Sequence, residues 1–338
     1  MYILKQLPED FRVCERSTIR SQERGKYVYF KLTKKNRNTL DVILELSRIF
    51  HVPEKHIGFA GTKDKNALTQ QICSILGVSR ERVLGVTCKG VVLEFLGYGD
   101  APVTLGDLKG NSFEIVVRNL DTENMRRVSG IANYFDEQRF STKNVEIGKC
   151  IVLKKFKEAV ELIDDVNCHA HLEERPADYV GALKKIPIRL LRLYVNAYQS
   201  KMWNETVSEY LRLRGRGIWE MDYSQGKLVF VENVEDFWEV EMPIVGFAGI
   251  DGVDDEEIRE IINKIMKREQ VTFTDFIIKQ IPELTLEGEM RKIMAAVQDV
   301  VIGSFEDDEL NSGKKKVRIC FSLGKGSYAT MVIRGMIG

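Results

Sequence analysis

Hydrophobic and polar residues alternate along much of the first 120 positions of the chain. In residues 26–34 ("KYVYFKLTK"), Val28, Phe30 and Leu32 alternate with the residues between them, a period of two that predicts a β-strand. Residues 38–52 show helical spacing instead, with Asn38 or Thr39 as the expected N-cap. Further strands are expected at 56–61, 69–76, 91–99 and 111–120, and a short helix at 79–85. This mixture predicts an α+β or α/β domain with a mixed, largely antiparallel sheet.

From about residue 143 the pattern becomes helical. Long amphipathic helices are expected at 145–165 and 188–214, residues 255–300 are expected to be mainly helical, and 227–232 is strand-like. Residues 316–335 predict two strands joined by a turn at 324–326. A hairpin cannot form a core alone, so we expect it to join the N-terminal sheet. This predicts a discontinuous domain (1–145 and 290–338) with a mainly helical insertion at 146–289.

Composition narrows the class of protein. The chain has 338 residues, 44% hydrophobic and 30% charged, which is typical of a soluble globular protein of about two domains. No stretch approaches the ~20 consecutive apolar residues of a membrane span, and acids come too early for a secretory signal. The six cysteines are widely separated, as expected of reduced thiols in the cytoplasm. Cys168, His169 and His171 lie close together, but a second ligand cluster is missing from the sequence, which argues against zinc.

Charge is balanced overall but segregated along the chain. Fifty basic residues cancel fifty acidic ones, whereas basic clusters recur at 31–37, 125–127, 184–192, 212–216 and 313–318. We expect one basic side that can contact anionic phosphates, although each cluster taken alone is more typical of a solvated surface. The candidate phosphate contacts are Lys34, Lys35, Arg37, Arg189, Arg192, Arg212, Arg214 and Arg216.

One acid stands out in the stretch "FAGTKDKNALTQQ". Asp64 lies between Lys63 and Lys65, just after a predicted short strand and a glycine. An aspartate in a turn is the ordinary interpretation. The alternative is a functional carboxylate that its flanking cations keep ionised while they attract a polyanion.

Six separated stretches together resemble the TruD family of tRNA pseudouridine synthases. They occur in the family's order from one end of the chain to the other, which makes the resemblance far more specific than any single motif. The stretches are "KQLPEDFRVCE", "FAGTKDKNALTQQ", "GNSFEIVVRNL", "NYFDEQRF", "NAYQSKMWNETV" and "GKGSYATMVIR".

The chain departs from the family pattern at four positions. The family usually has glycine where Asp136 and Ser141 stand, proline where Gly324 stands, and often an acid where Gly335 stands. The first two flank the expected pocket, so they bear on fine substrate preference more than on the chemistry.

The resemblance implies an isomerase that converts uridine to pseudouridine, with uridine 13 in the D arm of tRNA as substrate. By position in the motifs, Asp64 is the catalytic aspartate, Lys5 its partner and Phe135 the residue that stacks on a flipped base. It also implies a pseudouridine synthase catalytic domain with an inserted TRUD domain. The reaction needs no metal, nucleotide or redox cofactor, in keeping with a sequence that lacks the phosphate-binding glycine loops.

Other polar residues near these motifs have open roles. Lys63 and Lys65 contact phosphate, or one of them faces Asp64 in place of Lys5. Arg139 and Arg334 bind phosphate or pair with carboxylates. Uracil contacts or loop ordering are expected of Thr69, Gln71 and Asn111, and nucleotide positioning of Asn133 and Tyr134. An RNA-binding protein or tRNA chaperone of the same fold, without catalysis, is the alternative function. The expected partner is tRNA or another structured RNA, with no membrane and no obligate protein partner.

Overall fold

The computed structural model describes residues 2–140 and 143–337 of the chain, which form an α+β protein. The chain divides into two compact units. Unit 1 comprises Met1–Ser129 and Ala296–Ala329, and unit 2 comprises Gly130–Ala295 and Thr330–Gly338. The chain therefore passes between the units at residues 129/130, 295/296 and 329/330, rather than near 145 and 290.

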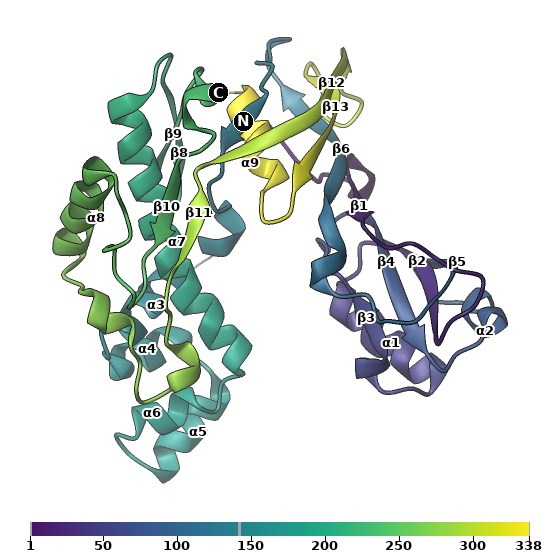
Figure 1. Ribbon diagram of the computed structural model, residues 1–338, viewed down its shortest axis with the longest axis horizontal. Helices are drawn as coiled ribbons and strands as arrows, with labels where there is room; N and C mark the ends of the chain where they lie inside the picture. Colours follow the sequence, from purple (N-terminus) through teal and green to yellow (C-terminus); the bar gives the residue numbers. More distant parts are fainter. Residues whose placement is uncertain (1, 141–142, 338) are drawn as a thin grey trace. The chain divides into compact units, whose positions relative to one another are not determined.

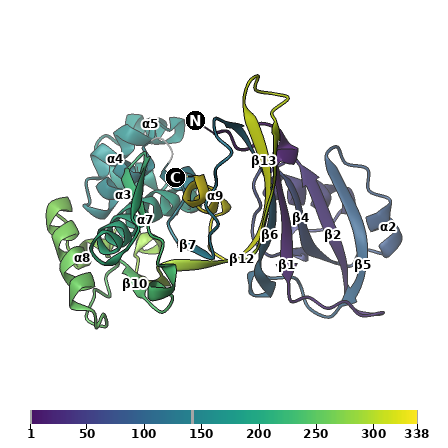
Figure 2. The ribbon, with the colours of Figure 1, turned by 90° about the horizontal axis from the view of Figure 1, so that it is seen from above.

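Unit 1 is built on one large, mostly antiparallel sheet (Figures 1 and 2). Its strand order is β5-β2-β4-β1-β6-β13-β12, with β3 pairing β4 from outside this path. Only β1 and β4 run parallel among the pairings whose register the structure describes. The strands are β1 (Phe11–Ser17), β2 (Tyr27–Lys35), β3 (Ile57–Phe59), β4 (Leu68–Leu76), β5 (Val91–Gly99), β6 (Leu108–Leu120), β12 (Met294–Asp307) and β13 (Lys315–Gly324).

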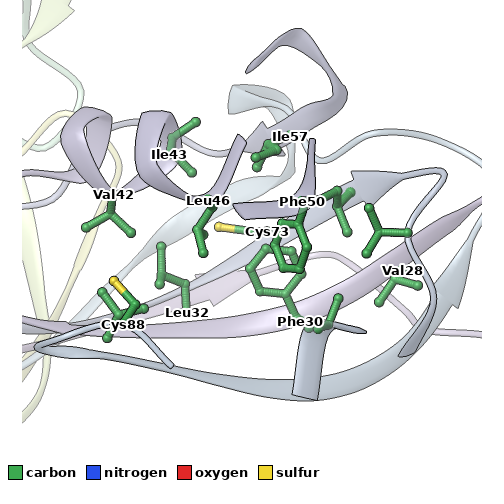
Figure 3. Packing of buried hydrophobic residues seen from close by; sticks show 14 residues of the cluster. Val28, Phe30, Leu32, Val42, Ile43, Leu46, Phe50, Ile57, Cys73 and Cys88 are labelled. Atoms are coloured by element: carbon green, nitrogen blue, oxygen red, sulfur yellow. The ribbon is translucent and has the colours of Figure 1, made fainter. Parts of the chain in front are cut away.

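Helix α1 (Thr39–Phe50) covers one face of this sheet and closes the core of unit 1. Its N-cap is Asn38, as expected, because the Asn38 side chain accepts a hydrogen bond from the Leu40 N–H. The buried face of α1 packs against Phe30, Leu32 and Cys73 of the strands (Figure 3). Burying each large apolar side chain contributes about 1.5–3 kcal/mol, so this contact fixes α1 and the loops at its ends. The short helix α2 (Arg80–Leu84) begins after Ser79, its N-cap.

The predicted C-terminal hairpin is wrong, although its expected return to the N-terminal sheet is confirmed. Strand β13 pairs with β6, and the stacked rings of Phe113 and Phe321 lie 5.4 Å apart. After Gly324 the chain forms helix α9 (Ala329–Ile337) instead of a second strand. Short apolar runs fit either state, and here the side chains of Met331, Val332 and Ile333 are buried within unit 2.

Unit 2 is mainly helical, with two small two-stranded sheets, β8–β9 and β10–β11 (Figure 1). The 27-residue helix α7 (Ile188–Arg214) is its central element and packs against α3, α8, β9 and β10. At Gly148 of α3 an added Cβ would lie 2.0 Å from the Tyr194 carbonyl oxygen, so glycine permits this close helix contact. The other elements are α3 (Asn144–Val152), α4 (Phe156–Ile163), α5 (Val166–Glu174), α6 (Tyr179–Leu183), α8 (Glu256–Glu269), β7 (Gly130–Ala132), β8 (Trp219–Tyr223), β9 (Gly226–Phe230), β10 (Glu241–Ile244) and β11 (Glu289–Lys292).

Two helix predictions in this unit are wrong in extent. The helix expected at 145–165 breaks between α3 and α4, where Lys154 adopts a left-handed conformation (φ 58°). Residues 255–300 are α-helical only in α8. Two short 3-10 helices (Phe273–Phe276 and Pro282–Leu284) follow, and then β11 and the start of β12. No helix in residues 2–140 and 143–337 is long and apolar enough to cross a membrane.

Candidate active site

Asp64 lies in the loop that joins β3 to β4 in unit 1, and its carboxylate pairs with Lys5. The Lys5 Nζ donates to Asp64 Oδ2 at 3.1 Å, and the two side chains are 22% and 33% exposed. The structure therefore identifies Lys5, rather than Lys63 or Lys65, as the lysine that faces this acid. A carboxylate that is paired yet accessible can act on a substrate that approaches from solvent.

The backbone at Lys5 is unusual. Lys5 adopts a positive φ of 60°, a conformation that non-glycine residues seldom take. Neighbouring Ile3 fixes the segment through two backbone hydrogen bonds with Arg118 of β6. The Lys5 Nζ also lies 4.1 Å from the centroid of the Phe11 ring, a cation–π contact. Strand pairing and the aromatic face together aim the ammonium group at Asp64.

Lys63 points the other way, into the unit. Its Nζ forms a 2.7 Å ion pair with Glu15, and the two side chains are only 6% and 1% exposed. Glu15 also accepts a hydrogen bond from the Ile72 N–H of β4, so the pair anchors the loop to the sheet. This burial removes Lys63 from the expected phosphate contacts, whereas Lys65 is exposed.

The polar residues expected near uracil lie beneath the loop. Gln71 is buried, and its amide donates to the Gly61 carbonyl at 3.2 Å, which favours the role of ordering the Asp64 loop. Thr69 is fully buried, so a base cannot reach it in this conformation. Asn111 is half-buried on β6. Within the part of the chain that the structure describes, Thr69 Oγ1 and Asn111 Oδ1 are buried without a hydrogen-bond partner.

Phe135 lies in unit 2 and is 7% exposed. Its backbone is held by Asn204 of α7, whose amide accepts from Phe135 N–H and donates to Phe135 C=O, both at 2.9 Å. The ring makes an edge contact with Trp203 at 5.5 Å, and the Cζ atoms of Arg139 and Arg291 lie 4.7 and 4.5 Å from its centroid. Two cations thus contact one aromatic ring.

Arg291 was not singled out from the sequence. Its guanidinium donates to Asn133 Oδ1 at 2.7 Å and to the Asn133 carbonyl at 2.9 Å. Asn133 therefore holds Arg291 against Phe135. By contrast, Tyr134 is fully buried, and its hydroxyl donates to the Val229 carbonyl at 2.7 Å while accepting from Ser208. Tyr134 thus supports Phe135 from the core and cannot contact a nucleotide in this conformation.

A cavity of about 240 Å³ opens beside Phe135 within unit 2. This volume is enough for a small planar group. The lining combines amide, hydroxyl and carboxylate side chains with apolar ones, and it includes Phe135, Arg139, Asn196, Gln199, Ser200 and Glu289. Gln199 and Ser200 come from the fifth of the motif stretches.

The four residues at which the chain departs from the TruD pattern lie in different surroundings. Asp136 accepts a hydrogen bond from the Glu137 N–H next to the expected pocket. Ser141 lies outside the described residues. Gly324 has open space around it, whereas a Cβ on Gly335 would lie 2.1 Å from Ile131 Cδ1. A larger residue at 335 would therefore require Ile131 to move.

Many of the expected phosphate contacts already have partners. Lys34 is fully buried, Lys35 pairs with Glu9, and Arg37 pairs with Glu45. In the cluster at 212–216, every arginine bonds an acid: Arg212 with Glu209 and Glu220, Arg214 with Glu257, and Arg216 with Asp236. Arg334 likewise bonds Glu137 at 3.3 Å, the carboxylate alternative for that residue.

The cysteine and histidines around position 168 are also engaged separately. Cys168 is buried and donates to the Ala182 carbonyl, His169 bonds Asp164, and His171 bonds Asp178. Across residues 2–140 and 143–337, three or more His, Cys, Asp or Glu side chains nowhere gather in a way that could hold a metal ion.

Comparison with known proteins agrees with the resemblance of the motifs. A sequence profile described as tRNA pseudouridine synthase D (TruD) matches residues 2–170 and 165–336. A Methanococcus maripaludis protein named "probable tRNA pseudouridine synthase D 1" is 31% identical over 98% of each chain. The tRNA pseudouridine synthase D of Aquifex aeolicus is 28% identical over 98% of this chain and 97% of its own.

The fold is similar to a solved structure as well. A crystal structure of a Methanosarcina mazei protein assigned to tRNA pseudouridine synthase D superposes with a TM-score of 0.71. It is 26% identical in sequence, and the match covers 99% of this chain and 93% of the other.

Proposed function

Because the chain belongs to the tRNA pseudouridine synthase D (TruD) family, we propose that it isomerises uridine to pseudouridine in tRNA, at uridine 13 of the D arm. We further propose that it acts in the cytoplasm, with Asp64 as its catalytic carboxylate. The observation that carries the proposal is the 3.1 Å pair between Lys5 and a partly exposed Asp64 in the most family-like stretch of the chain.

The chemistry calls for a positioned carboxylate. Isomerisation breaks the bond between uracil N1 and C1′ of the ribose, turns the base, and joins C1′ to C5, which loses its proton while N1 gains one. An ionised carboxylate assists such a step by attacking carbon or by stabilising positive charge as the glycosidic bond breaks. Lys5 binds Asp64 through Oδ2, and Oδ1 has no hydrogen-bond partner within residues 2–140 and 143–337. That oxygen is the one we assign to the substrate.

Unit 2, taken by itself, carries groups of the kind that bind a base and its phosphates. A base removed from the RNA stack needs an aromatic platform and polar contacts at its edge. The Phe135 ring supplies the platform, and the half-buried Asn196 lines the cavity beside it. Gln199 and Ser200 in the same lining are buried and already donate to the carbonyls of Val245 and Asn196. Arg139 and Arg291 supply positive charge for the phosphates next to the flipped nucleotide.

Asp64→Asn tests the proposed chemistry. The amide has the same shape but cannot attack carbon or carry negative charge, so we expect loss of pseudouridine formation on a tRNA transcript with little change in tRNA affinity. Asp41→Asn is the matched control, because Asp41 is an exposed aspartate on α1. Pseudouridine would be mapped by base position, so the same assay tests uridine 13.

The outcomes separate the alternatives. Substantial turnover by Asp64→Asn would contradict the assignment of this residue. Binding of tRNA without pseudouridine from the unsubstituted protein would favour an RNA-binding protein or tRNA chaperone instead. Pseudouridine at a different position of the tRNA would support the proposed activity but contradict uridine 13 as its target.

A further inference from the structure

Lys34, at the end of β2, is a lysine with no exposed surface. Its Nζ lies within hydrogen-bond distance of three backbone carbonyl oxygens: 2.7 Å from that of Asp64, 2.8 Å from that of Arg37 and 3.2 Å from that of Lys63. An ammonium group has three donors and no acceptor, so these three carbonyls use all its hydrogen-bonding capacity. Lys34 is therefore unable to contact RNA, and two of its three partners belong to the loop that carries Asp64.

This arrangement demands the charged form of the lysine. A neutral amine has only two donors and would turn its lone pair toward one of the carbonyl oxygens. Burying a charge is costly unless hydrogen bonds compensate for the lost water, and here only the converging carbonyls do so. The ammonium group and the loop conformation thus stabilise each other.

We infer that Lys34 is a positioning residue, which holds the backbone of residues 63–64 so that the Asp64 carboxylate meets Lys5 and the substrate in the productive geometry. Its effect on turnover rests on the proposed function of Asp64, whereas its effect on the order of the loop does not. The buried ion pair between Lys63 and Glu15 anchors the same loop from the other side. Lys34 and this ion pair fix the backbone on either side of the exposed carboxylate.

The charge of Lys34 has a predictable pH range. Burial lowers the pKa of Lys34 from 10.5 to about 8, with the negative charge of Asp64 opposing and the positive charge of Lys63 assisting the shift. The Arg37 guanidinium, in the turn before α1, pairs with Glu45, and the strand residues opposite Lys34, Thr69 of β4 and Val91 of β5, do not titrate. The ammonium group is therefore present below pH 8 and lost above it, and the loop should loosen as the pH rises through this value.

The test compares Lys34→Met, Lys34→Arg and Lys26→Met in the full chain. Methionine keeps the length without the charge, arginine keeps the charge, and Lys26 is an exposed lysine directly before the same strand. The measurements are hydrogen exchange of the amides in residues 60–67, the single-turnover rate of pseudouridine formation, and tRNA affinity. The measured hydrogen-exchange rates are corrected for the pH dependence of exchange in unstructured peptides.

We expect Lys34→Met to speed exchange at residues 63–64 by about tenfold or more, as local opening becomes easier. Its turnover should fall by about 100-fold, the usual effect of a catalytic group displaced by about 1 Å, with tRNA affinity unchanged. Lys34→Arg should restore part of the rate and remove the decline above pH 8 seen with the unsubstituted protein. Lys26→Met should match the unsubstituted protein in exchange and rate.

Near-normal exchange in Lys34→Met would overturn the inference, as would equal losses in affinity and turnover. If the methionine variant fails to fold, the unsubstituted protein tests the inference instead. Between pH 7 and 9.5 its normalised hydrogen exchange should become faster and its rate of pseudouridine formation should fall. Constant values across that range would also overturn the inference. Activity in Asp64→Asn would refute the proposed function alone, since the exchange measurement does not depend on catalysis.

Discussion

The Phe135 ring, which we propose stacks on a base, is mostly covered by other side chains. Guanidinium groups of Arg139 and Arg291 lie within 5 Å of its centroid, and Trp203 contacts it edge to face. A base that stacks on this ring must displace one of the guanidinium groups. The displaced arginine then lies beside the incoming nucleotide, where a phosphate can replace the aromatic ring as its partner.

Phe135→Ala should therefore weaken the productive tRNA complex by about 1–3 kcal/mol, the usual contribution of stacking between a base and an aromatic side chain. Phe135→Tyr should cost less, because the ring face remains. The measurement is kcat/KM on a tRNA transcript, with thermal unfolding followed in parallel. Phe140→Ala controls for simple loss of a buried aromatic ring in the same unit. Equal effects of the alanine and tyrosine variants at 135 would show that Phe135 serves the core alone.

The sequence predicts the surroundings of some residues better than those of others. Lys34 continues the buried alternation of Val28, Phe30 and Leu32 on β2, so the period of two contained a signal that it is buried. Arg291 had no such signal. Its contact with Asn133 joins positions 158 residues apart, and no local pattern specifies a contact across that separation.

Elements were predictable where periodicity is long and capped. Strand β2, helix α1 with its Asn38 cap, and α7 all follow their patterns. The errors occur where a short apolar run fits both states, as in α9, or where one residue reverses the chain, as at Lys154 between α3 and α4. In such places tertiary packing decides the conformation, and a local pattern cannot supply that information.

Glu269, the last residue of α8, joins three helices of unit 2 and yields a prediction about elements. Its carboxylate accepts from Lys149 of α3 at 2.7 Å and from Lys201 of α7 at 2.5 Å. Burial opposes ionisation, but these hydrogen bonds prevail and lower the pKa of Glu269 to about 2. Removing one partner of a fully buried pair costs about 3–5 kcal/mol, and since Lys149 is about a third exposed we expect about 2 kcal/mol for Glu269→Gln.

The sign of the pH dependence follows from a pKa below the ordinary 4.5. The stabilisation by Glu269 is complete above pH 4.5 and is lost as the pH falls through 2, so the variant and the unsubstituted protein should converge there. Denaturant unfolding followed by tryptophan fluorescence measures unit 2 alone, because all 3 tryptophans (Trp203, Trp219 and Trp238) belong to it. Glu260→Gln, an exposed change on the same helix, is the control, and an equal loss there would refute the assignment.

For the whole molecule, balanced charge does not mean uniform charge. The arginines at 212–216 are neutralised locally by acids, as described above. Lys184, Lys185, Arg189 and Arg192 are exposed before and at the start of α7, and within the described residues none of them forms an ion pair with a carboxylate. Arg192 donates to the Glu283 carbonyl. These four cations are the better candidates for phosphate contacts in unit 2.

Changing Lys184, Lys185, Arg189 and Arg192 together to Gln should lower the slope of log affinity against log salt by slightly under one for each phosphate that is no longer bound. The effect should be similar for any tRNA, because phosphate contacts position without specifying sequence. Changing Arg212, Arg214 and Arg216 to Gln is the matched control and should alter the slope little. The slope is measured by titrating tRNA at several salt concentrations. A lower slope only for the variant at 212–216 would show that this cluster, and not the other four cations, contacts the RNA.

The pairing of β6 with β13 also governs when the protein can become active during its synthesis. Glu114 and Arg318, which bond across these strands, are 204 residues apart, and all of unit 2 except α9 is translated between them. Until β13 leaves the ribosome, β6 has an open edge, and Arg118, which anchors the Lys5 segment, lacks Asp308. Pairings so distant in sequence form slowly, and the unpaired edge is prone to aggregation meanwhile. Chaperone demand should therefore peak late in translation, while unit 2 is already folding.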